Sequence, residues 1–297
     1  MRVLATGATG FAGRHLVDAC TAGGDDVIAA PPSSALDLRA PAAARRLVAD
    51  TRPDVVYHLA ARAHVGQSWE DPFGTFSDNV AMTAALLEAV RAEAPDAVVL
   101  SVGSGEEYGP PETVPTEEAH PLRPQNPYAV SKASSGLLAR FYADGYGLRV
   151  IHARAFNHAG PGQEAIYAIA NFARQFAEGL DAAADPITVV TGSPDTRRDF
   201  TDVRDVVRAY RTLAAHGEPG VFNICSGVTH SARELVAALG EVAGVAIDHQ
   251  VDPAKVRAHE VHEIRGANDH LTAATGWRPE IPLETTLRDT LAWWRQT

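Results

Sequence analysis

The sequence predicts an α/β protein with a Rossmann-type, doubly wound parallel sheet and a smaller mixed α/β substrate domain. Three observations carry this prediction. Short, almost wholly apolar runs alternate with stretches of helical spacing over the first 157 residues. A glycine-rich turn follows the first apolar run and opens a helical stretch. Beyond about residue 157 the alternation loosens into Gly- and Pro-rich loops without a low-complexity linker, which indicates a second region packed on the first.

The elements can be taken in chain order. Apolar runs predict strands at 2–6, 26–30, 55–60, 97–102, 148–153 and 221–225. Helical spacing predicts helices at 11–20, 42–49, 75–93 and 128–144, and an amphipathic helix from residue 283 to 294. Because crossovers between parallel strands are right-handed, these strands are expected to form one sheet with helices on both faces.

Two domains follow from this order. Residues 1–157 form the predicted dinucleotide-binding domain, and residues 200–227 return to it. Residues 158–199 and 228–297 form the predicted substrate domain.

The composition excludes several classes of protein. The 297 residues carry 26 Lys plus Arg against 37 Asp plus Glu, a net charge of −11, which argues against a nucleic-acid binder. Cys20 and Cys225 lie far apart, so neither a disulfide scaffold nor a cysteine zinc site is expected. No apolar run approaches a membrane span and the N-terminus does not resemble a signal peptide. We therefore expect a cytoplasmic protein without membrane or nucleic-acid partners.

The glycine-rich turn is the first chemical motif. Gly7 permits a tight turn, Gly10 lets the backbone approach a pyrophosphate, and Gly13 allows helix and strand to touch. The N-terminus of the helix offers free N–H groups and partial positive charge to phosphates. The turn therefore predicts a dinucleotide site.

The residues at the end of the second strand of such a domain distinguish NAD(H) from NADP(H). Residues 29–34 carry neither an Asp for a ribose 2′-hydroxyl nor an Arg for a 2′-phosphate. Ser33 and Ser34 suit either group, whereas Arg14 and Arg39 are cations able to fold back, and Asp37 suits the adenine edge. The balance favours NADP(H) over NAD(H).

Tyr128 and Lys132 form the second motif. They stand four residues apart behind Pro127, so a helix starting there presents both on one face. A free tyrosine has a pKa near 10, and a nearby ammonium together with the charge of the nicotinamide is expected to lower it toward the working range. The pair predicts proton transfer beside a nicotinamide.

Several short segments of the sequence resemble motifs of a known family. TGATGFAGRHL, HLAARAHV, PYAVSK and RDFTDVRD together resemble an extended short-chain dehydrogenase/reductase acting on nucleotide sugars. VGSGEEYG, FNHAGPGQ and GWRPEIPLETTL resemble more closely the GDP-4-keto-6-deoxy-D-mannose reductases, from residue 1 to about 295. The resemblance implies reduction of the 4-keto group of GDP-4-dehydro-6-deoxy-D-mannose to GDP-D-rhamnose with NADPH or NADH.

The resemblance also implies site residues. Tyr128 matches the family's proton donor, Lys132 its partner, and Ser104 the hydroxyl that bonds the sugar carbonyl. The implied catalytic set is Ser104, Tyr128, Lys132 and Glu106. The implied cofactor-binding positions are Gly7, Thr9, Gly10, Phe11, Gly13, Asp37, Leu38, Leu59, Ala60, Ala61, Tyr128 and Lys132. The implied substrate-binding positions are His64, Ser104, Gly105, Glu106, Asn157, Arg198, Arg257 and Glu260.

Some of these matches are imperfect. Arg257 lies in a loop that lacks both prolines of the family pattern, which puts GDP in competition with dTDP as the nucleotide. Arg198 matches a diphosphate-binding position, and its alternative is a surface ion pair with Asp195 or Asp199.

Other reactions stay open. Glu106 falls where 4,6-dehydratases keep a base, but Gly105 stands where the dTDP-glucose dehydratases place an acid, so its absence counts against elimination. A 4-epimerase, a dTDP-4-keto-6-deoxysugar reductase and a non-enzymatic NADPH sensor are the remaining alternatives. The histidine pairs His259/His262 and His58/His64 are expected to hold no metal.

The family's members usually pair as dimers. Helices 75–93 and 128–144 of two protomers would form a four-helix bundle, and four alanines are small enough for close packing: Ala81, Ala84, Ala85 and Ala139.

Overall fold

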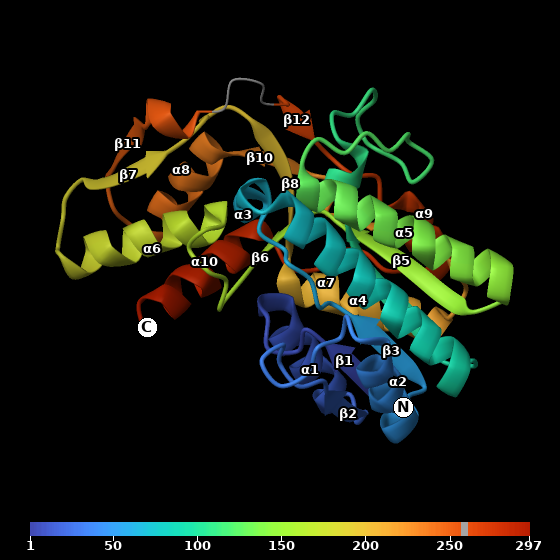
Figure 1. The fold of residues 1–297 in the computed structure, drawn as a ribbon. Coiled ribbons are helices and arrows are strands. Elements are labelled where there is room, and N and C mark those ends of the chain that lie inside the picture. Colours follow the sequence, from blue (N-terminus) through green and yellow to red (C-terminus); the bar gives the residue numbers. More distant parts are fainter. Residues whose placement is uncertain (257–260) are drawn as a thin grey trace.

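The computed structural model describes residues 1–256 and 261–297, and a six-stranded parallel sheet forms its centre (Figure 1). The strand order is β2-β1-β3-β4-β5-β9. Their bounds are β1 Arg2–Thr6, β2 Asp26–Ala29, β3 Val55–His58, β4 Val98–Ser104, β5 Arg149–Ala155 and β9 Gly220–Ile224. The order reverses between β1 and β3, which is where such sheets bind ligands at their carboxyl edge.

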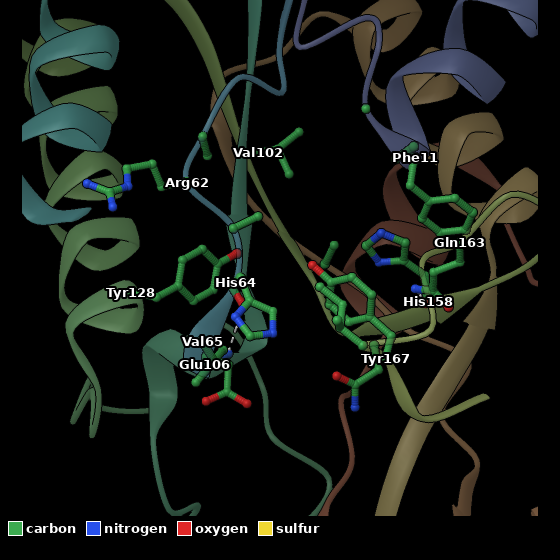
Figure 2. Close-up of a pocket in the computed structure, with 18 of the residues that line it drawn as sticks. Phe11, Arg62, His64, Val65, Val102, Glu106, Tyr128, His158, Gln163 and Tyr167 are labelled. Carbon is green, nitrogen blue, oxygen red and sulfur yellow. Dashed lines mark hydrogen bonds between the residues drawn. The ribbon is translucent and has the colours of Figure 1, made fainter. Parts of the chain in front are cut away.

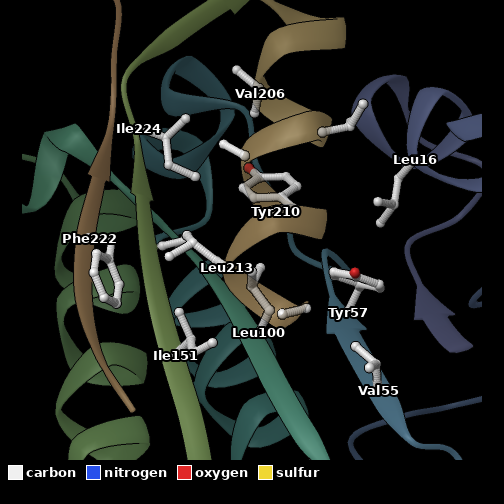
Figure 3. Close-up of a cluster of buried hydrophobic side chains, with 14 of the residues drawn as sticks. Leu16, Val55, Tyr57, Leu100, Ile151, Val206, Tyr210, Leu213, Phe222 and Ile224 are labelled. Atoms are coloured by element: carbon white, nitrogen blue, oxygen red, sulfur yellow. The ribbon is translucent and has the colours of Figure 1, made fainter. Parts of the chain in front are cut away.

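Helices cover both faces of this sheet. One face carries α1 (Phe11–Ala22), α7 (Val203–His216) and α9 (Asp269–Thr275), and the other carries α2 (Pro41–Thr51), α4 (Pro72–Glu93) and α5 (Pro127–Tyr146). Successive residues of a strand point to opposite faces of the sheet. Val3 packs with α1 and α7, and Leu4 packs with α2 and α4. Figure 3 shows the first of these cores around Leu100 and Tyr210. Burial on both faces explains why apolar residues predominate in the strands.

A third core lies beyond the sheet. Helices α6 (Ala168–Asp181), α8 (Ala232–Ala243) and α10 (Leu283–Trp294) pack there with β7 (Ile187–Thr191) and β11 (Ile247–Val251), which pair in parallel. Between this core and the helices of the central sheet lies β8 (Arg197–Asp202), which contacts both α7 and α10. Its partners are β6 (Asn157–Ala159), β10 (Thr229–Ser231) and β12 (Glu263–Ile264). The short helices are α3 (Val65–Glu70), η1 (Gly105–Tyr108) and η2 (Pro253–Lys255).

The predicted fold class is confirmed, and the element boundaries differ by a few residues. The strand predicted at 55–60 ends at His58, because the chain bends so that Ala60 lies against Gly7. The strand predicted at 97–102 continues to Ser104. The helix predicted at 75–93 begins at Pro72, where Asp71 caps it by accepting a 2.9 Å hydrogen bond from the Gly74 amide. Among the described helices, none has the length and apolarity to cross a membrane.

Two glycines fix how α1 meets β1. Gly7 has a φ of +68°, and a Cβ there would lie 2.7 Å from the Ala60 nitrogen. A Cβ on Gly13 would lie 2.1 Å from the Gly7 carbonyl oxygen. Only glycine allows the first turn of α1 to rest directly on the β1–α1 loop.

We expect Gly13→Ala to destabilise the protein by about 2 kcal/mol or more, because the added methyl meets rigid backbone. Gly145→Ala is the matched control: its Cβ would meet only the Phe141 ring at 3.7 Å, and stability should change by less than about 1 kcal/mol. Urea unfolding followed by circular dichroism measures both. Equal stability of the two variants would contradict this account of the α1 contact.

Candidate active site

The carboxyl edge of the sheet opens into a cleft of about 1630 Å³. This exceeds the roughly 300–1,000 Å³ of a typical single-ligand pocket, so the cleft has room for two ligands. It runs from the glycine turn, past the ends of β3 and β4, to residues 191–198 and Lys255. Every predicted site residue lines it except Arg257 and Glu260, which lie outside the described residues.

The glycine-turn end fits a dinucleotide. Helix α1 starts at an N-cap glycine, Gly10, without a side-chain cap, so no side chain occupies its N-terminal amides. Bare amides at a helix N-terminus suit a diphosphate. The other predicted cofactor positions lining this end are Gly7, Thr9, Phe11, Gly13, Asp37, Leu38, Leu59, Ala60 and Ala61.

The predicted basic residues at this end already have partners. Arg39 Nε donates to Asp37 Oδ1 at 2.8 Å, and Arg39 Nη1 donates to Asp78 Oδ1 at 2.7 Å. Arg14 Nη2 donates to the Gly162 carbonyl at 3.0 Å. Arg39 and Ser33 line the cleft, so a guanidinium and a hydroxyl stand where the adenosine half of a cofactor would end.

Ser104, Tyr128 and Lys132 meet in the middle of the cleft. Ser104 is the last residue of β4, and its side chain faces that of Tyr128 across the cleft that both residues line. Tyr128 and Lys132 stand one turn apart on α5, with the Lys132 Nζ 5.9 Å from the centre of the Tyr128 ring. Lys132 Nζ donates to the Val102 carbonyl at 2.7 Å. The end of β4 therefore holds the lysine and faces the tyrosine.

Burial shifts the pKa values of this pair in opposite directions. Desolvation lowers the pKa of Lys132 to about 8. Desolvation also raises the pKa of Tyr128 above its ordinary value, and the neighbouring Ser104 hydroxyl lowers it only in part. In the ligand-free protein the pKa of Tyr128 is raised and not lowered, because the Lys132 Nζ is directed to Val102 and burial dominates. The expected lowering also rests on the nicotinamide charge, which only a bound cofactor supplies. A raised pKa keeps the phenol protonated, as a proton donor requires.

Glu106 and His64 are also held by neighbours. Asn126, the N-cap of α5, accepts from the Ala129 amide at 2.8 Å and donates through Nδ2 to Glu106 Oε2 at 3.0 Å. His64 caps α3 by accepting from the Gln67 amide at 2.9 Å. Figure 2 shows Tyr128 and Tyr167 on opposite sides of the cleft, with His64 and Glu106 between them.

Tyr167 and Asn126 were not singled out in the sequence. Tyr167 is the N-cap residue of α6, and its ring lies edge-on to His64 with centroids 6.3 Å apart. The signal for Asn126 was present in the phrase Asn-Pro-Tyr, since Asn before Pro is a helix-capping pattern. No pattern in the sequence pointed to Tyr167.

The far end of the cleft carries Asn157 and Arg198. Arg198 Nη1 donates to the Val261 carbonyl at 2.9 Å. Asp195 and Asp199, the alternative partners of Arg198 named in the sequence analysis, make contacts with other residues. Asp195 pairs with Arg233 at 2.9 Å, and Asp199 accepts from the Ser226 amide at 2.8 Å. Lys255, Thr191 and Ser193 also line this end and were not predicted.

Within residues 1–256 and 261–297, no three His, Cys, Asp or Glu side chains are grouped to hold a metal ion. His58 is buried between β1 and α4, where it bonds Thr6 Oγ1 at 2.8 Å and Thr83 Oγ1 at 3.2 Å. Burial lowers its pKa to about 3, so the ring is neutral. His259 lies outside the described residues.

A doubly wound sheet, a glycine turn and a Ser/Tyr/Lys set in one cleft define the class of short-chain dehydrogenase/reductase enzymes that use a nicotinamide cofactor. The family model described as GDP-mannose 4,6 dehydratase matches residues 33–290. The GDP-6-deoxy-D-mannose reductase of Pseudomonas aeruginosa is 38% identical over 99% of this chain and 97% of its own length. The chain belongs to this GDP-mannose 4,6-dehydratase-like family of extended short-chain dehydrogenase/reductases.

Solved structures agree. The structure of RMD from Pseudomonas aeruginosa complexed with NADPH superposes with a TM-score of 0.90 at 35% identity, covering 100% of this chain and 99% of that one. The UDP-glucose 4-epimerase of Thermus thermophilus, in complex with NAD, gives a TM-score of 0.86 at 32% identity, covering 99% of each chain. The relatives therefore include a reductase and an epimerase, and they bind different nicotinamide cofactors.

We expect the Lys132 ammonium to titrate near pH 8 in the free protein, because its burial disfavours the charge. The sequence contains only two lysines, Lys132 and Lys255, so ¹⁵N-lysine labelling gives two side-chain signals. Lys255→Arg assigns them, and NMR across pH 6 to 11 follows the titration. A Lys132 signal that titrates only near its ordinary value of about 10.4 would contradict the burial argument.

Proposed function

We propose that this protein reduces the 4-keto group of a nucleotide-linked 4-keto-6-deoxyhexose with NADPH or NADH. GDP-4-dehydro-6-deoxy-D-mannose, giving GDP-D-rhamnose, is the favoured substrate. The observation that carries the proposal is the meeting of Ser104, Tyr128 and Lys132 in one cleft that is large enough for cofactor and sugar nucleotide together. The relative of 38% identity that is named as a GDP-6-deoxy-D-mannose reductase supports the choice of sugar.

The chain's own residues have separable tasks. The bound cofactor supplies the hydride. Tyr128, protonated because burial raises its pKa, gives its phenolic proton to the C4 oxygen as negative charge develops there. Ser104 donates a hydrogen bond to the same oxygen. Lys132, whose Nζ donates to the Val102 carbonyl, binds the ribose next to the nicotinamide. Because it stands one turn from Tyr128 on α5, it also orients the tyrosine relative to that ribose.

The sugar nucleotide occupies the opposite end. His64, Gly105 and Asn157 line the part of the cleft expected to contact the sugar, and Arg198 supplies positive charge for the diphosphate. Arg257 and Glu260 are proposed to join them, for the diphosphate and the nucleoside ribose respectively. dTDP is the alternative to GDP.

Elimination is disfavoured by the surroundings of Glu106. Its carboxylate accepts from Asn126, which itself caps α5, so Glu106 has a structural task beside any chemical one. Gly105 supplies no second acid. A 4-epimerase is the other alternative, and the likeness to the Thermus enzyme favours testing it.

NADPH is the proposed cofactor of choice. Arg39 and Ser33 line the adenosine end, and a cation together with a hydroxyl favours a 2′-phosphate. The similar structure that contains NADPH supports this choice. NADH is the alternative, because Asp37 and Asp78 already neutralise Arg39.

The substrate assay decides between these reactions. We expect NADPH oxidation on adding GDP-4-dehydro-6-deoxy-D-mannose, with GDP-D-rhamnose identified by NMR, and weaker reaction with NADH or the dTDP sugar. Tyr128→Phe should lower turnover by about two orders of magnitude and leave cofactor binding unchanged. A 4-keto product from GDP-mannose without reductant would indicate a dehydratase, and interconversion of UDP-glucose an epimerase. Failure to oxidise cofactor with any keto sugar would overturn the proposal.

We propose a division of labour between two domains, 1–157 with 200–227 for the cofactor and 158–199 with 228–297 for the sugar nucleotide. The core of α6, α8 and α10 supports it, whereas Leu271 and Trp277 pack into the core of the cofactor domain. A cytoplasmic location is proposed with it. The free thiols of Cys20 and Cys225, both buried, suit a reducing compartment.

A homodimer through α4 and α5 is also proposed. The two helices pack together, and they expose large apolar side chains: Phe76, Val130, Leu137, Phe141 and Tyr146. Ala85 and Ala139 are buried inside the chain, so they serve packing within one protomer and not the interface for which they were considered. An apolar face of this kind is typical of a protein interface.

Light scattering tests the dimer. We expect a solution mass of twice 31.5 kDa. Leu137→Glu combined with Phe141→Glu should return the protein to the monomer mass, because charges would enter the apolar contact. Val228→Glu, which changes another exposed apolar residue, is the control and should remain dimeric. A wild-type mass of 31.5 kDa at micromolar concentration would count against the interface.

A further inference from the structure

A buried carboxylate lies behind the active site. Glu106 and Glu107 are neighbours on the η1 turn, yet only Glu106 lines the cleft. Glu107 is 0% exposed. A fully buried glutamate is rare unless it is paired, so the partners of Glu107 indicate its structural role.

Glu107 receives hydrogen bonds from three directions. Its Oε1 accepts from the backbone amide of Ser104 at 2.8 Å. The same oxygen lies 2.9 Å from His152 Nε2, and Oε2 accepts from Arg154 Nε at 2.8 Å. His152 and Arg154 are alternate residues of β5, so both point to the same face of the strand. The carboxylate thus ties Ser104, at the end of β4, to the neighbouring strand.

Two glycines, Gly103 and Gly136, leave space for the side chains of Glu107 and His152. A Cβ on Gly103 would lie 2.4 Å from both Glu107 Oε1 and His152 Nε2, and a Cβ on Gly136 would lie 2.6 Å from His152 Nε2. Any other residue at either position would displace the imidazole or the carboxylate. Arg154 is fixed in turn, since its Nη1 donates to the Tyr108 hydroxyl at 2.9 Å.

The carboxylate is charged throughout the physiological range. Burial alone would raise its pKa, but His152 and Arg154 hold the pKa of Glu107 down to about 2. An ionised acceptor makes stronger hydrogen bonds than a neutral one, and here it holds a backbone amide of the active site.

We propose that Glu107 is a positioning residue, which fixes the end of β4 from behind so that the Ser104 hydroxyl faces Tyr128 and the substrate carbonyl. It touches neither ligand site. Ser104 Oγ accepts from the Glu106 amide at 3.2 Å, and Ser104 lines the cleft beside Tyr128, so rotation of the Ser104 backbone would turn its hydroxyl away from the tyrosine. The kinetic part of this inference rests on the proposed reductase function, whereas its structural part does not.

Two variants of nearly equal size test the proposal. Glu107→Gln keeps one oxygen that can accept from the Ser104 amide, and we expect kcat per cofactor-loaded site to fall about threefold. Glu107→Leu removes every acceptor, and we expect a fall of about tenfold or more. In both variants the Kd of NADPH and the KM of the keto sugar should stay close to wild type. A merely structural role would reduce the number of loaded sites and leave turnover per site unchanged.

Hydrogen exchange of the NADPH-bound protein gives a readout that needs no substrate. We expect faster exchange in peptides covering 103–108 for both variants, with little change elsewhere. Asp205→Asn is the matched control, because Asp205 is also buried and accepts from the Glu280 and Ile281 amides at 2.8 Å, away from the cleft. It should lower stability without lowering turnover per loaded site.

The outcomes separate this inference from the proposed function. Wild-type turnover per site in both folded variants, or unchanged exchange at 103–108, would overturn it. If Glu107→Leu does not fold, the same two measurements on Glu107→Gln decide. If the wild-type protein reduces no keto sugar, the reductase proposal fails and the exchange measurement alone decides the role of Glu107.

Discussion

The contact of Gly13 with the carbonyl of Gly7 is the constraint on which the remaining geometry depends. It sets the first turn of α1 directly on the end of β1 and leaves the helix amides facing the carboxyl edge of the sheet. The strands of a parallel sheet all run in the same direction, so Leu59 after β3 and Ser104 at the end of β4 reach that edge too. Residues from distant parts of the sequence therefore meet in one cleft.

Charge is arranged locally against the overall excess of acid. The chain carries a net charge of −11, yet both proposed ligands are anions. Three groups supply positive charge or hydrogen-bond donors inside the cleft. They are the uncapped amides of α1, Lys132, whose Nζ donates to a carbonyl, and Arg198 at the far end. Arg39 is different, because two carboxylates already surround it. A negative total is therefore compatible with anion binding, since it describes the whole surface and not the cleft.

Sequence patterns predicted the fold class and the position of Tyr128 and Lys132 one turn apart on a helix, because both depend on short-range spacing. They predicted strand ends less well, since the bend after His58 depends on Ala60 meeting Gly7 in another element. The direction of the Tyr128 pKa was missed because burial is a property of the assembled cleft. Glu107 was missed for the same reason. Its partners His152 and Arg154 stand 45 and 47 residues away and reach it only through the pairing of β4 with β5.

The end of β4 has a consequence for how this protein can evolve. Val102 accepts a hydrogen bond from Lys132 and Ser104 places its hydroxyl beside Tyr128, two residues apart on one strand. Side chains alternate along a strand, so one inserted or deleted residue between them would turn the serine to the opposite face of the sheet. Descendants of this sequence can therefore lengthen or shorten their surface loops, but the stretch from Val102 to Glu107 must keep its length.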